Sequence, residues 1–264
     1  MFKFIQCVQN ENKTVTPEET IYAIKNAGFD GVFAQIYNKD WKFSQEKQIE
    51  LCLKLGLEIP FAHLGYTNIN DIWCEGEAGH NLIKSYCDDL DVCNKYGIKM
   101  VVMHLVSGKP KFEPNLIGLV RFQTIVDYAE KLGIKVAFEN TKAFGYLEYV
   151  LEKIQNPNAG VCFDSGHYHC HFNDTFSWDM FKNRIFALHL HDNDTSKDQH
   201  LLPFDGSLNW KETIKHLKEA NYDGPISLES CYRNDYLNQS VEDFYKLSYQ
   251  KAQELKELFE DKNL

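Results

Sequence analysis

The feature that most constrains the fold of this chain is a junction in which a helical stretch ends at glycine and a β-type run follows at once. It occurs four times, as NAGFDGVF (26–33), KLGLEIPF (54–61), KYGIKMVV (95–102) and KLGIKVAF (131–138). Glycine is a common helix stop because it adopts the left-handed backbone conformation at little steric cost. The repeated junction therefore predicts a regular alternation of helices and strands along the chain.

Eight β-type runs, separated by longer helical patterns, occur along the 264 residues. The expected strands are 2–8, 31–36, 58–64, 98–104, 134–140, 159–164, 185–191 and 225–230. The first helical pattern opens with Thr16 as an expected N-cap and Pro17 at the first helical position. Eight strand–helix units in a chain of this length predict an α/β fold, a single (β/α)8 or TIM barrel spanning 1–264. A doubly wound open sheet is the alternative, but CVQNENKT (7–14) is not the glycine-rich turn that such a sheet would carry.

Composition narrows the classes of partner and compartment. The formal net charge is −10, and only three of the 28 basic residues are arginine, which argues against a nucleic acid as the main partner. No apolar stretch approaches the ~18 residues that cross a bilayer, and the start of the chain lacks the pattern of a signal peptide. The eight cysteines form no CxxC pair, so we expect reduced thiols in a cytoplasmic protein with no membrane partner.

Successive residues of a strand point to opposite faces, so each expected strand can be divided into an inner and an outer side. In KVAFE (135–139), Val136 and Phe138 share one face, while Ala137 and Glu139 share the other. The bulky apolar face should pack on the outer helices, and the face with smaller residues should line the barrel. By this argument six strands carry an ionisable inner residue near their carboxyl ends. These are His63, His104, Glu139, Asp164, His189 or His191, and Glu229.

These inner residues predict a metal site. Active sites of such barrels lie at the carboxyl ends of the strands, so the six side chains should converge there. A single histidine at a strand end is more often structural, but carboxylates and imidazoles buried together are costly unless a cation neutralises them. His80 and His216 fit no strand end and should lie on the surface, whereas His169 and His171 could support the site or belong to a loop. The 66–80 segment should be an irregular insertion over one end of the barrel.

Several motifs resemble those of the xylose-isomerase-like barrel superfamily. They are VAFENT (136–141), GVCFDSGH (160–167), LHLHDND (188–194), DQH (198–200) and SLES (227–230). That superfamily holds sugar and sugar-phosphate isomerases and epimerases, and also apurinic endonucleases of the endonuclease IV type. The resemblance covers nearly the whole chain, implies a single barrel, and leaves the substrate open.

In the epimerase branch, the resemblance implies one divalent metal ion, Mn²⁺, Zn²⁺, Co²⁺ or Mg²⁺. Its expected ligands are Glu139, Asp164, His189 and Glu229. The H-x-x-[DE] pattern of that branch fits His189 through Asp192 and also His191 through Asp194. We prefer His189 as the ligand, which would leave His191 to support the site or face the substrate.

The same branch implies isomerisation or epimerisation of a sugar, a sugar phosphate or a similar hydroxy-carbonyl compound through an enediolate. Glu139 and Glu229 would then be the catalytic base and acid. His167 resembles the histidine that contacts substrate in this branch. The expected partner is a small carbohydrate, and the resemblance also implies a possible homodimer.

The endonuclease branch implies more ligands, for three zinc ions. The residues at similar positions are His63, His104, His167, Asp198 and His200. The loop NDTSKDQHLLPFDG (193–206) departs from that branch because it is short, acidic and without arginine. A zinc phosphodiesterase acting on abasic DNA is therefore the alternative function, and lyase or dehydratase chemistry on polyols is a third.

Four further residues are candidate substrate contacts. Arg233 and Lys142 each follow an inner-face glutamate by a few residues and could hold a phosphate or carboxylate group. The aromatic rings of Trp41 and Tyr66 could close over a sugar ring.

Overall fold

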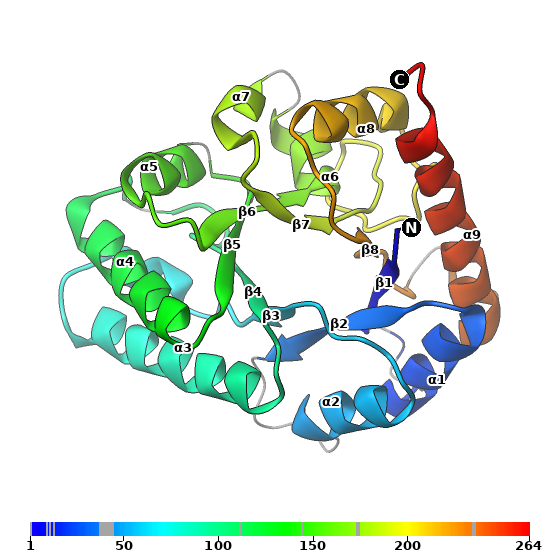
Figure 1. Cartoon of the computed structure of the whole chain (residues 1–264), viewed down its shortest axis with the longest axis horizontal. Coiled ribbons are helices and arrows are strands. Elements are labelled where there is room, and N and C mark those ends of the chain that lie inside the picture. The colour runs from blue at the N-terminus through cyan, green and yellow to red at the C-terminus, as the bar shows by residue number, and fades with distance from the viewer. Residues whose placement is uncertain are drawn as a thin grey trace.

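The computed structural model describes residues 2–8, 10, 12, 14–36, 45–110, 112–143, 145–172, 175–233 and 236–264. Within these residues eight parallel strands form a nearly closed barrel that helices surround (Figure 1). The strands are β1 (Phe4–Cys7), β2 (Gly31–Ile36), β3 (Ala62–Leu64), β4 (Met100–Met103), β5 (Lys135–Glu139), β6 (Ala159–Asp164), β7 (Ile185–His189) and β8 (Ile226–Leu228). The predicted (β/α)8 barrel is confirmed.

The strand order runs from β7 through β6, β5, β4, β3, β2 and β1 to β8. A bridge between Leu190 and Leu228 connects the two ends of this order. There the Leu190 N–H donates to the carbonyl of Ser227 at 2.9 Å, and the Glu229 N–H donates to the carbonyl of Leu190 at 3.0 Å. The barrel therefore closes just beyond the carboxyl ends of β7 and β8, where the ionisable residues lie.

The helices follow the predicted alternation. They are α1 (Pro17–Ala27), α2 (Gln45–Lys54), the 3₁₀-helix η1 (Ile69–Trp73), α3 (Glu77–Lys95), α4 (Leu116–Lys131), α5 (Tyr146–Lys153), α6 (Ser165–His167), the π-helix η2 (Tyr168–Phe172), α7 (Trp178–Phe181), α8 (Trp210–Glu219) and α9 (Val241–Glu260). Thr16 caps α1, since its side chain accepts from the Glu19 N–H while the Glu19 carboxylate accepts from the Thr16 N–H. None of the helices in the described ranges is both long and apolar enough to cross a membrane.

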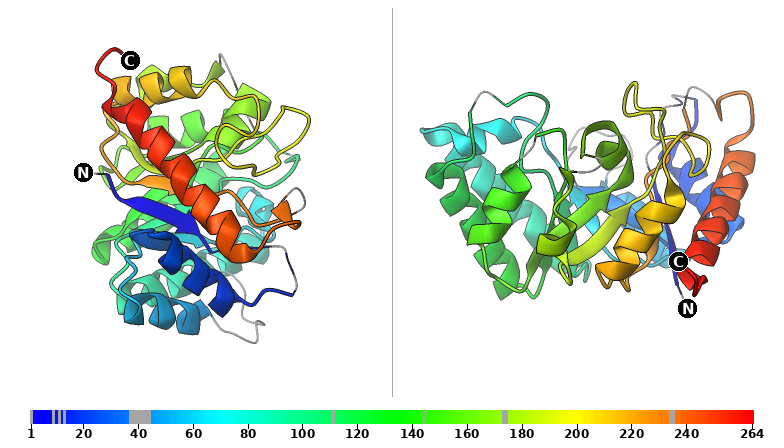
Figure 2. Two further views of the ribbon diagram at one scale, coloured as in Figure 1. Left: turned by 90° about the vertical axis from the view of Figure 1, so that its right-hand side faces the viewer. Right: turned by 90° about the horizontal axis from the view of Figure 1, so that it is seen from above.

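The chain termini lie at the end of the barrel opposite the long loop after β7. Figure 2 shows that loop, in yellow, on one side and both termini on the other. Helices α1 and α9 pack against each other and cover β1. Strand β1 therefore pairs with β8 in the sheet and lies beneath α9. The termini lie away from the end of the barrel that carries the ionisable residues.

Strand parity separates two cores. Val136 and Phe138 pack outward with the helices, whereas Ala137 belongs to an inner cluster. That cluster contains Ile5, Cys7, Phe33, Phe61, Val102, Ala137, Cys162 and Ala187. The expectation of small inner residues holds for β5 to β7 but is wrong for β2 and β3. There the rings of Phe33 and Phe61 stack at 5.0 Å and fill the space that the small residues opposite leave.

The 66–80 segment is more ordered than expected. It contains η1 and the first turn of α3, where His80 is exposed as predicted. Trp73 is buried at the end of η1 and packs on Gly118, where a Cβ atom would lie 2.0 Å from the indole ring. A five-residue 3₁₀-helix is too short for hydrophobic periodicity to reveal, so tertiary packing rather than local pattern defines this segment.

Candidate metal centre

Four side chains from four strands converge at the carboxyl end of the barrel. We call Glu139, Asp164, His189 and Glu229 the strand-end group; one ligand atom from each lies within 4.8 Å of the others. His189 Nδ1 is 3.3 Å from Glu139 Oε2 and 3.5 Å from Glu229 Oε2. Asp164 and His189 are fully buried, and Glu139 and Glu229 are only 2% and 7% exposed. Glu139, Asp164 and His189 are the last residues of their strands, and Glu229 directly follows β8, so the backbone ladder determines their spacing.

His63 and His104 lie on the other side of Glu139. Their Nε2 atoms are 3.2 Å and 3.3 Å from Glu139 Oε2. His63 Nδ1 is 2.8 Å from the carbonyl oxygen of Leu64, which can only accept, so Nδ1 carries a proton and donates it. These two histidines and Glu139 also bring three ligand atoms within 4.8 Å of one another.

Two features of these residues fit a bound cation. Both ring nitrogens of His189 are buried and make no hydrogen bond to any residue that the structure describes. In addition, the neutral form of His63, protonated at Nδ1, would point the lone pair of Nε2 at a carboxylate oxygen. A divalent ion between nitrogen and oxygen donors removes both penalties.

The pKa values of the two glutamates move in opposite directions. Burial alone would raise the pKa of the Glu139 carboxyl, but the charges of His104 and His189 outweigh it and hold that pKa well below its ordinary value. Burial raises the pKa of Glu229 well above the ordinary value, and the nearby carboxylates of Glu139 and Asp164 raise it further. The same centre thus favours the charged form of Glu139 and disfavours the charged form of Glu229 when no metal is bound.

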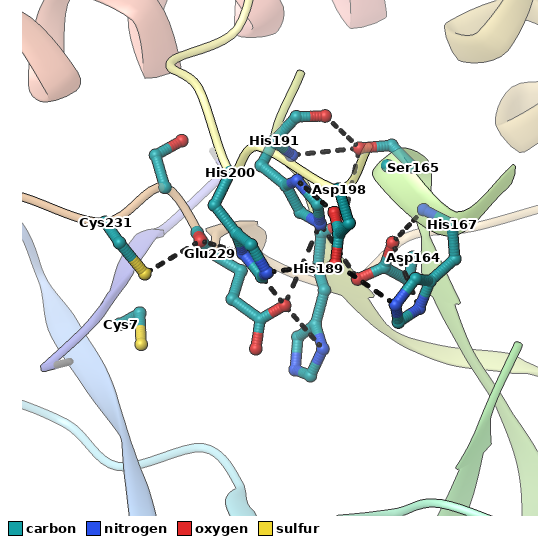
Figure 3. A network of polar contacts seen from close by, with 12 residues as sticks. Cys7, Asp164, Ser165, His167, His189, His191, Asp198, His200, Glu229 and Cys231 are labelled. Atoms are coloured by element: carbon teal, nitrogen blue, oxygen red, sulfur yellow. Dashed lines mark hydrogen bonds and ion pairs between the residues drawn. The ribbon is translucent and has the colours of Figure 1, made fainter. Parts of the chain in front are cut away.

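A second set of ligand atoms lies on and beside the loop after β7. We call His191, Asp198 and His200 the loop group; it too brings three ligand atoms within 4.8 Å of one another. Figure 3 shows Asp198 between the rings of His167 and His200; its Oδ2 is 3.3 Å from His167 Nε2 and 3.2 Å from His200 Nε2. The rings of His191 and His200 stack at 4.1 Å. The side chains of Asp198 and His200 are 17% and 18% exposed, so this group lies nearer the solvent.

His167 connects the two groups. Its Nδ1 lies 3.3 Å from Glu139 Oε1 and its Nε2 faces Asp198. Burial opposes its protonation, but the carboxylates of Asp164 and Asp198 outweigh that effect and raise the pKa of His167 well above its usual value. A substrate oxygen near the strand-end group would therefore meet a hydrogen-bond donor here.

The structure separates the two candidate histidines of the H-x-x-[DE] pattern. His189 faces Glu139 and Glu229, whereas His191 lies between the two groups. Its Nε2 is 3.1 Å from Asp164 Oδ2 and 3.9 Å from Glu229 Oε2, and its Nδ1 faces Asp198 of the loop group. The acid three residues after His189 has a different role. The carboxylate of Asp192 is fully buried and accepts hydrogen bonds from four N–H groups. The donors are the backbone N–H groups of Asn193, Phe204 and Leu208 and the indole N–H of Trp210.

The candidate substrate contacts have different surroundings. The ring of Tyr66 stacks on His104 at 4.2 Å and is 43% exposed, so it lies at the edge of the centre. Lys142 is exposed just beyond β5. The Arg233 guanidinium donates to the backbone carbonyls of Asp198 and Gln199 and so helps to position the loop. A contact between Arg233 and a phosphate or carboxylate group of the substrate stays a prediction. Trp41 lies outside the described residues.

The remaining histidines lie near the rim or away from the site. His169 Nε2 is 2.9 Å from the hydroxyl of Ser207, and the ring of His171 is 6.5 Å from that of His167. His169 therefore contacts the segment after β7, and a supporting role of His169 and His171 in the site stays a prediction. His216 stacks on Trp178 in α7 at 4.9 Å, away from the strand ends, as expected for a residue outside the site.

Asn140, Ser165 and Cys231 are polar residues near the site that the sequence pattern did not single out. Asn140 and Ser165 directly follow Glu139 and Asp164 of the strand-end group. Their own residue types do not indicate metal binding, so the sequence pattern indicated only the charged residues beside them. A hydrogen bond involving the Cys7 thiol lowers the pKa of the Cys231 thiol to about 6, and Figure 3 shows the two sulfur atoms facing each other. Strand parity could have placed Cys7 inside the barrel, but Cys231 lies beyond the end of β8.

The chain matches a known family and several curated proteins. The family model described as "Xylose isomerase-like TIM barrel" matches residues 21–264. The uncharacterized protein y4fM of Sinorhizobium fredii is 27% identical over 216 residues, which are 76% of this chain and 68% of that protein. The uncharacterized protein MJ1311 of Methanocaldococcus jannaschii is 38% identical over 117 residues, 40% of each chain. The inosose isomerase of Halalkalibacterium halodurans is 28% identical over 137 residues, which are 46% of this chain and 47% of that enzyme.

Solved structures show the same fold at low identity. A D-tagatose 3-epimerase-like protein superposes with a TM-score of 0.77 at 22% identity, covering 99% of this chain and 100% of that chain. The D-psicose 3-epimerase of Clostridium cellulolyticum H10, solved with D-tagatose, gives 0.76 at 15% identity over 99% and 100% of the chains. The IolI protein with a bound zinc atom gives 0.73 at 18% identity over 97% and 98%. Together with the family match over most of its length, this likeness shows that the chain belongs to the xylose isomerase-like TIM barrel family.

Proposed function

We propose that this protein is a divalent-metal-dependent isomerase or epimerase acting on a sugar or a similar hydroxy-carbonyl compound. The observation that carries the proposal is the convergence of Glu139, Asp164, His189 and Glu229 within 4.8 Å of one another. The partial match to an inosose isomerase and the folds shared with sugar epimerases support the substrate class.

The chemistry would be removal and return of a proton at a carbon next to a carbonyl group, through an enediolate of the substrate. A divalent ion, when bound, polarises carbonyl and hydroxyl oxygens and so acidifies the neighbouring C–H group. Glu139 and Glu229 come from strands that are not neighbours in the barrel. They would therefore flank the reacting carbon, so that one can accept a proton while the other donates one.

Substrate would approach from the side of the loop group. Exposure rises from zero at Asp164 and His189 to 18% at the His200 side chain and 43% at Tyr66. Sugar hydroxyl groups could there hydrogen-bond His167 and Asp198, and the exposed ring of Tyr66 could cover an apolar sugar face.

The proposal is tested by solvent deuterium exchange into ketoses and inososes. Metal-stripped protein would be reconstituted with Mn²⁺, Co²⁺, Mg²⁺ or Zn²⁺, and proton NMR would follow loss of the C–H signal next to the carbonyl. We expect exchange only with metal present, and we expect Glu229→Gln to abolish it while the fold is retained. Lack of exchange with every hydroxy-ketone and every metal would reject the proposal, and a product lacking one water molecule would indicate a dehydratase.

A second candidate function is phosphoester cleavage with more than one zinc ion. The observation that favours it is that further ligand sets lie on both sides of the strand-end group. One is the loop group, and the other consists of His63, His104 and Glu139, so that it shares Glu139 with the strand-end group. Such neighbouring ions can activate water and stabilise a leaving oxygen. Elemental analysis decides between the candidates, because three zinc ions per chain together with cleavage of abasic DNA would favour the phosphodiesterase. One ion per chain and inactivity toward DNA would favour the isomerase.

A further inference from the structure

Two polar side chains make the same type of bridge between neighbouring strand ends. Asn140 follows Glu139 at the end of β5 and is 1% exposed. Its Oδ1 accepts the backbone N–H of Asp164 at 2.7 Å, and its Nδ2 donates to the backbone carbonyl of Asp164 at 2.9 Å. One side chain thus holds both backbone groups of a residue in the strand-end group.

Ser165 repeats the arrangement on the next pair of strands. It follows Asp164 at the end of β6 and is fully buried. Its hydroxyl donates to the backbone carbonyl of His191 at 2.7 Å and accepts the backbone N–H of His191 at 2.9 Å. Figure 3 shows these two bonds running from Ser165 to the segment that continues β7.

Both bridges begin where the sheet ladder stops. The β5–β6 pairing ends at Glu139 and Cys162, two residues before Asp164. The β6–β7 pairing ends at Asp164 and His189, two residues before His191. Each side chain therefore supplies one further pair of hydrogen bonds between adjacent strands, at the level where the ligand side chains leave the backbone.

We propose that Asn140 and Ser165 are positioning residues of the metal centre, an inference that rests on the proposed metal-dependent function. Together they connect Glu139, Asp164 and the segment after His189 in one continuous series of side-chain bridges. Neither bridge uses a ligand atom, so both leave the carboxylate and imidazole donors available. Metal ligands must be held within about 0.5 Å of their productive positions, and partners that orient ligands affect metal affinity strongly.

The test compares each bridge with a similar bridge elsewhere in the chain. Ser165→Ala is matched by Thr20→Val, because the buried Thr20 hydroxyl in α1 donates to the Thr16 carbonyl and accepts from Asn10. Asn140→Ala is matched by Asn115→Ala, because Asn115 accepts the Gly118 N–H and donates to the Trp73 carbonyl at the start of α4. Affinity for Zn²⁺ or Mn²⁺ would be measured by calorimetric titration, and urea unfolding of the metal-free proteins would report stability.

We expect the two site variants to bind metal about 10- to 100-fold more weakly than the wild type. The two controls should stay within about twofold of the wild type, although all four variants lose a comparable part of their stability. Equal metal affinity in a folded site variant and its control would overturn the inference, as would failure of both site variants to fold while both controls fold. If the wild type bound no metal, or if Glu229→Gln bound it as well as the wild type, the proposed function would fail and this inference with it.

Discussion

The strand-end group and the loop group are built in different ways. The members of the strand-end group lie on or next to paired strands, and the most exposed, Glu229, is only 7% exposed. Asp198 and His200 of the loop group depend instead on a few contacts between distant segments, among them the bond from the Cys231 N–H to the His200 carbonyl. The His200 Nδ1 atom lies 2.9 Å from the Glu229 carbonyl, and Arg233 holds the carbonyl of Asp198.

This difference shows two ways of placing a polar side chain. The position of a strand-end residue is determined by a hydrogen-bond ladder that the whole barrel stabilises. Most single substitutions elsewhere should therefore leave the positions of its side-chain atoms unchanged. A loop residue depends on a few buried polar contacts, and the loss of one acceptor leaves its donors unpaired. The strand-end group should therefore respond mainly to changes in its own ligands, and the loop group to changes in its anchors.

The largest effect is expected from a change within the strand-end group itself. Asp164→Asn removes one negative charge without a change of shape, so the affinity for a divalent ion should fall by more than about 100-fold, since partners of ligands alone contribute 10–100-fold. Asp194→Asn, in an exposed turn of the loop, should leave the affinity unchanged within about twofold. Calorimetric titration measures both, and similar affinities in the two variants would contradict the assignment of Asp164.

The next largest effect is expected at the anchor of the loop. In Asp192→Asn, the new NH₂ group must face two N–H donors in either orientation, since each carboxylate oxygen accepts two hydrogen bonds. We expect a loss of about 2–4 kcal/mol in the free energy of unfolding. The metal affinity of the strand-end group should change by less than about threefold. Urea unfolding and metal titration test both statements. If Asp192→Asn lost as much metal affinity as Asp164→Asn, the two groups would not depend on separate structural supports.

The same distinction explains what the sequence could predict. The eight strands were recognisable because β-type runs and glycine junctions alternate along the chain, and inward-facing positions of a strand follow from a period of two. Glu139, for example, shares a face with Ala137, and both are buried inside the barrel. Phe33 and Phe61 were not foreseen there, because the need to fill a barrel interior is a property of all strands together.

Residues beyond the strand ends were harder to interpret. Asp192 matched a ligand pattern in the sequence, yet its carboxylate accepts four hydrogen bonds from 193–210. Arg233 suggested a phosphate contact, yet it donates to carbonyls of a loop more than thirty residues earlier. Contacts of this kind depend on how segments distant in the sequence pack over the rim of the barrel. Neither the spacing of motif residues nor the hydrophobic periodicity of the sequence predicts that packing.

A smaller effect is expected where the two groups touch. A Cβ atom at Gly166 would lie 2.0 Å from Cε1 of the buried His191 ring, which contacts both Asp164 and Asp198. Gly166→Ala should displace that ring and lower the free energy of unfolding by about 1–3 kcal/mol. In a His191→Ala background the same substitution should have a clearly smaller effect, and equal effects in both backgrounds would show that the ring is not what Gly166 accommodates.

A pH-dependent effect is expected from protonation of the loop group in protein stripped of metal. His200 has an acceptor at each ring nitrogen, the Glu229 carbonyl at Nδ1 and the Asp198 carboxylate at Nε2. Although burial opposes protonation, the hydrogen bond to Asp198 raises the pKa of His200 to about 10. An unfolded histidine has a pKa of about 6.5, so the stabilisation from this group is complete below that pH and is lost as the pH rises through about 10.

Raising the pH from 7 to 10 should therefore lower the free energy of unfolding more in the wild type than in His200→Gln, by up to about 3 kcal/mol. Asp198→Asn should reduce this slope in the same way, because it removes the charge that holds the proton on His200. Urea unfolding at several pH values measures the slope, and NMR of the His200 ring reports its protonation directly. If one ion occupies only the strand-end group, His200 should stay protonated at neutral pH after metal is added. Loss of that proton on metal addition would instead show that the loop group binds an ion of its own, since a ligating imidazole must be neutral.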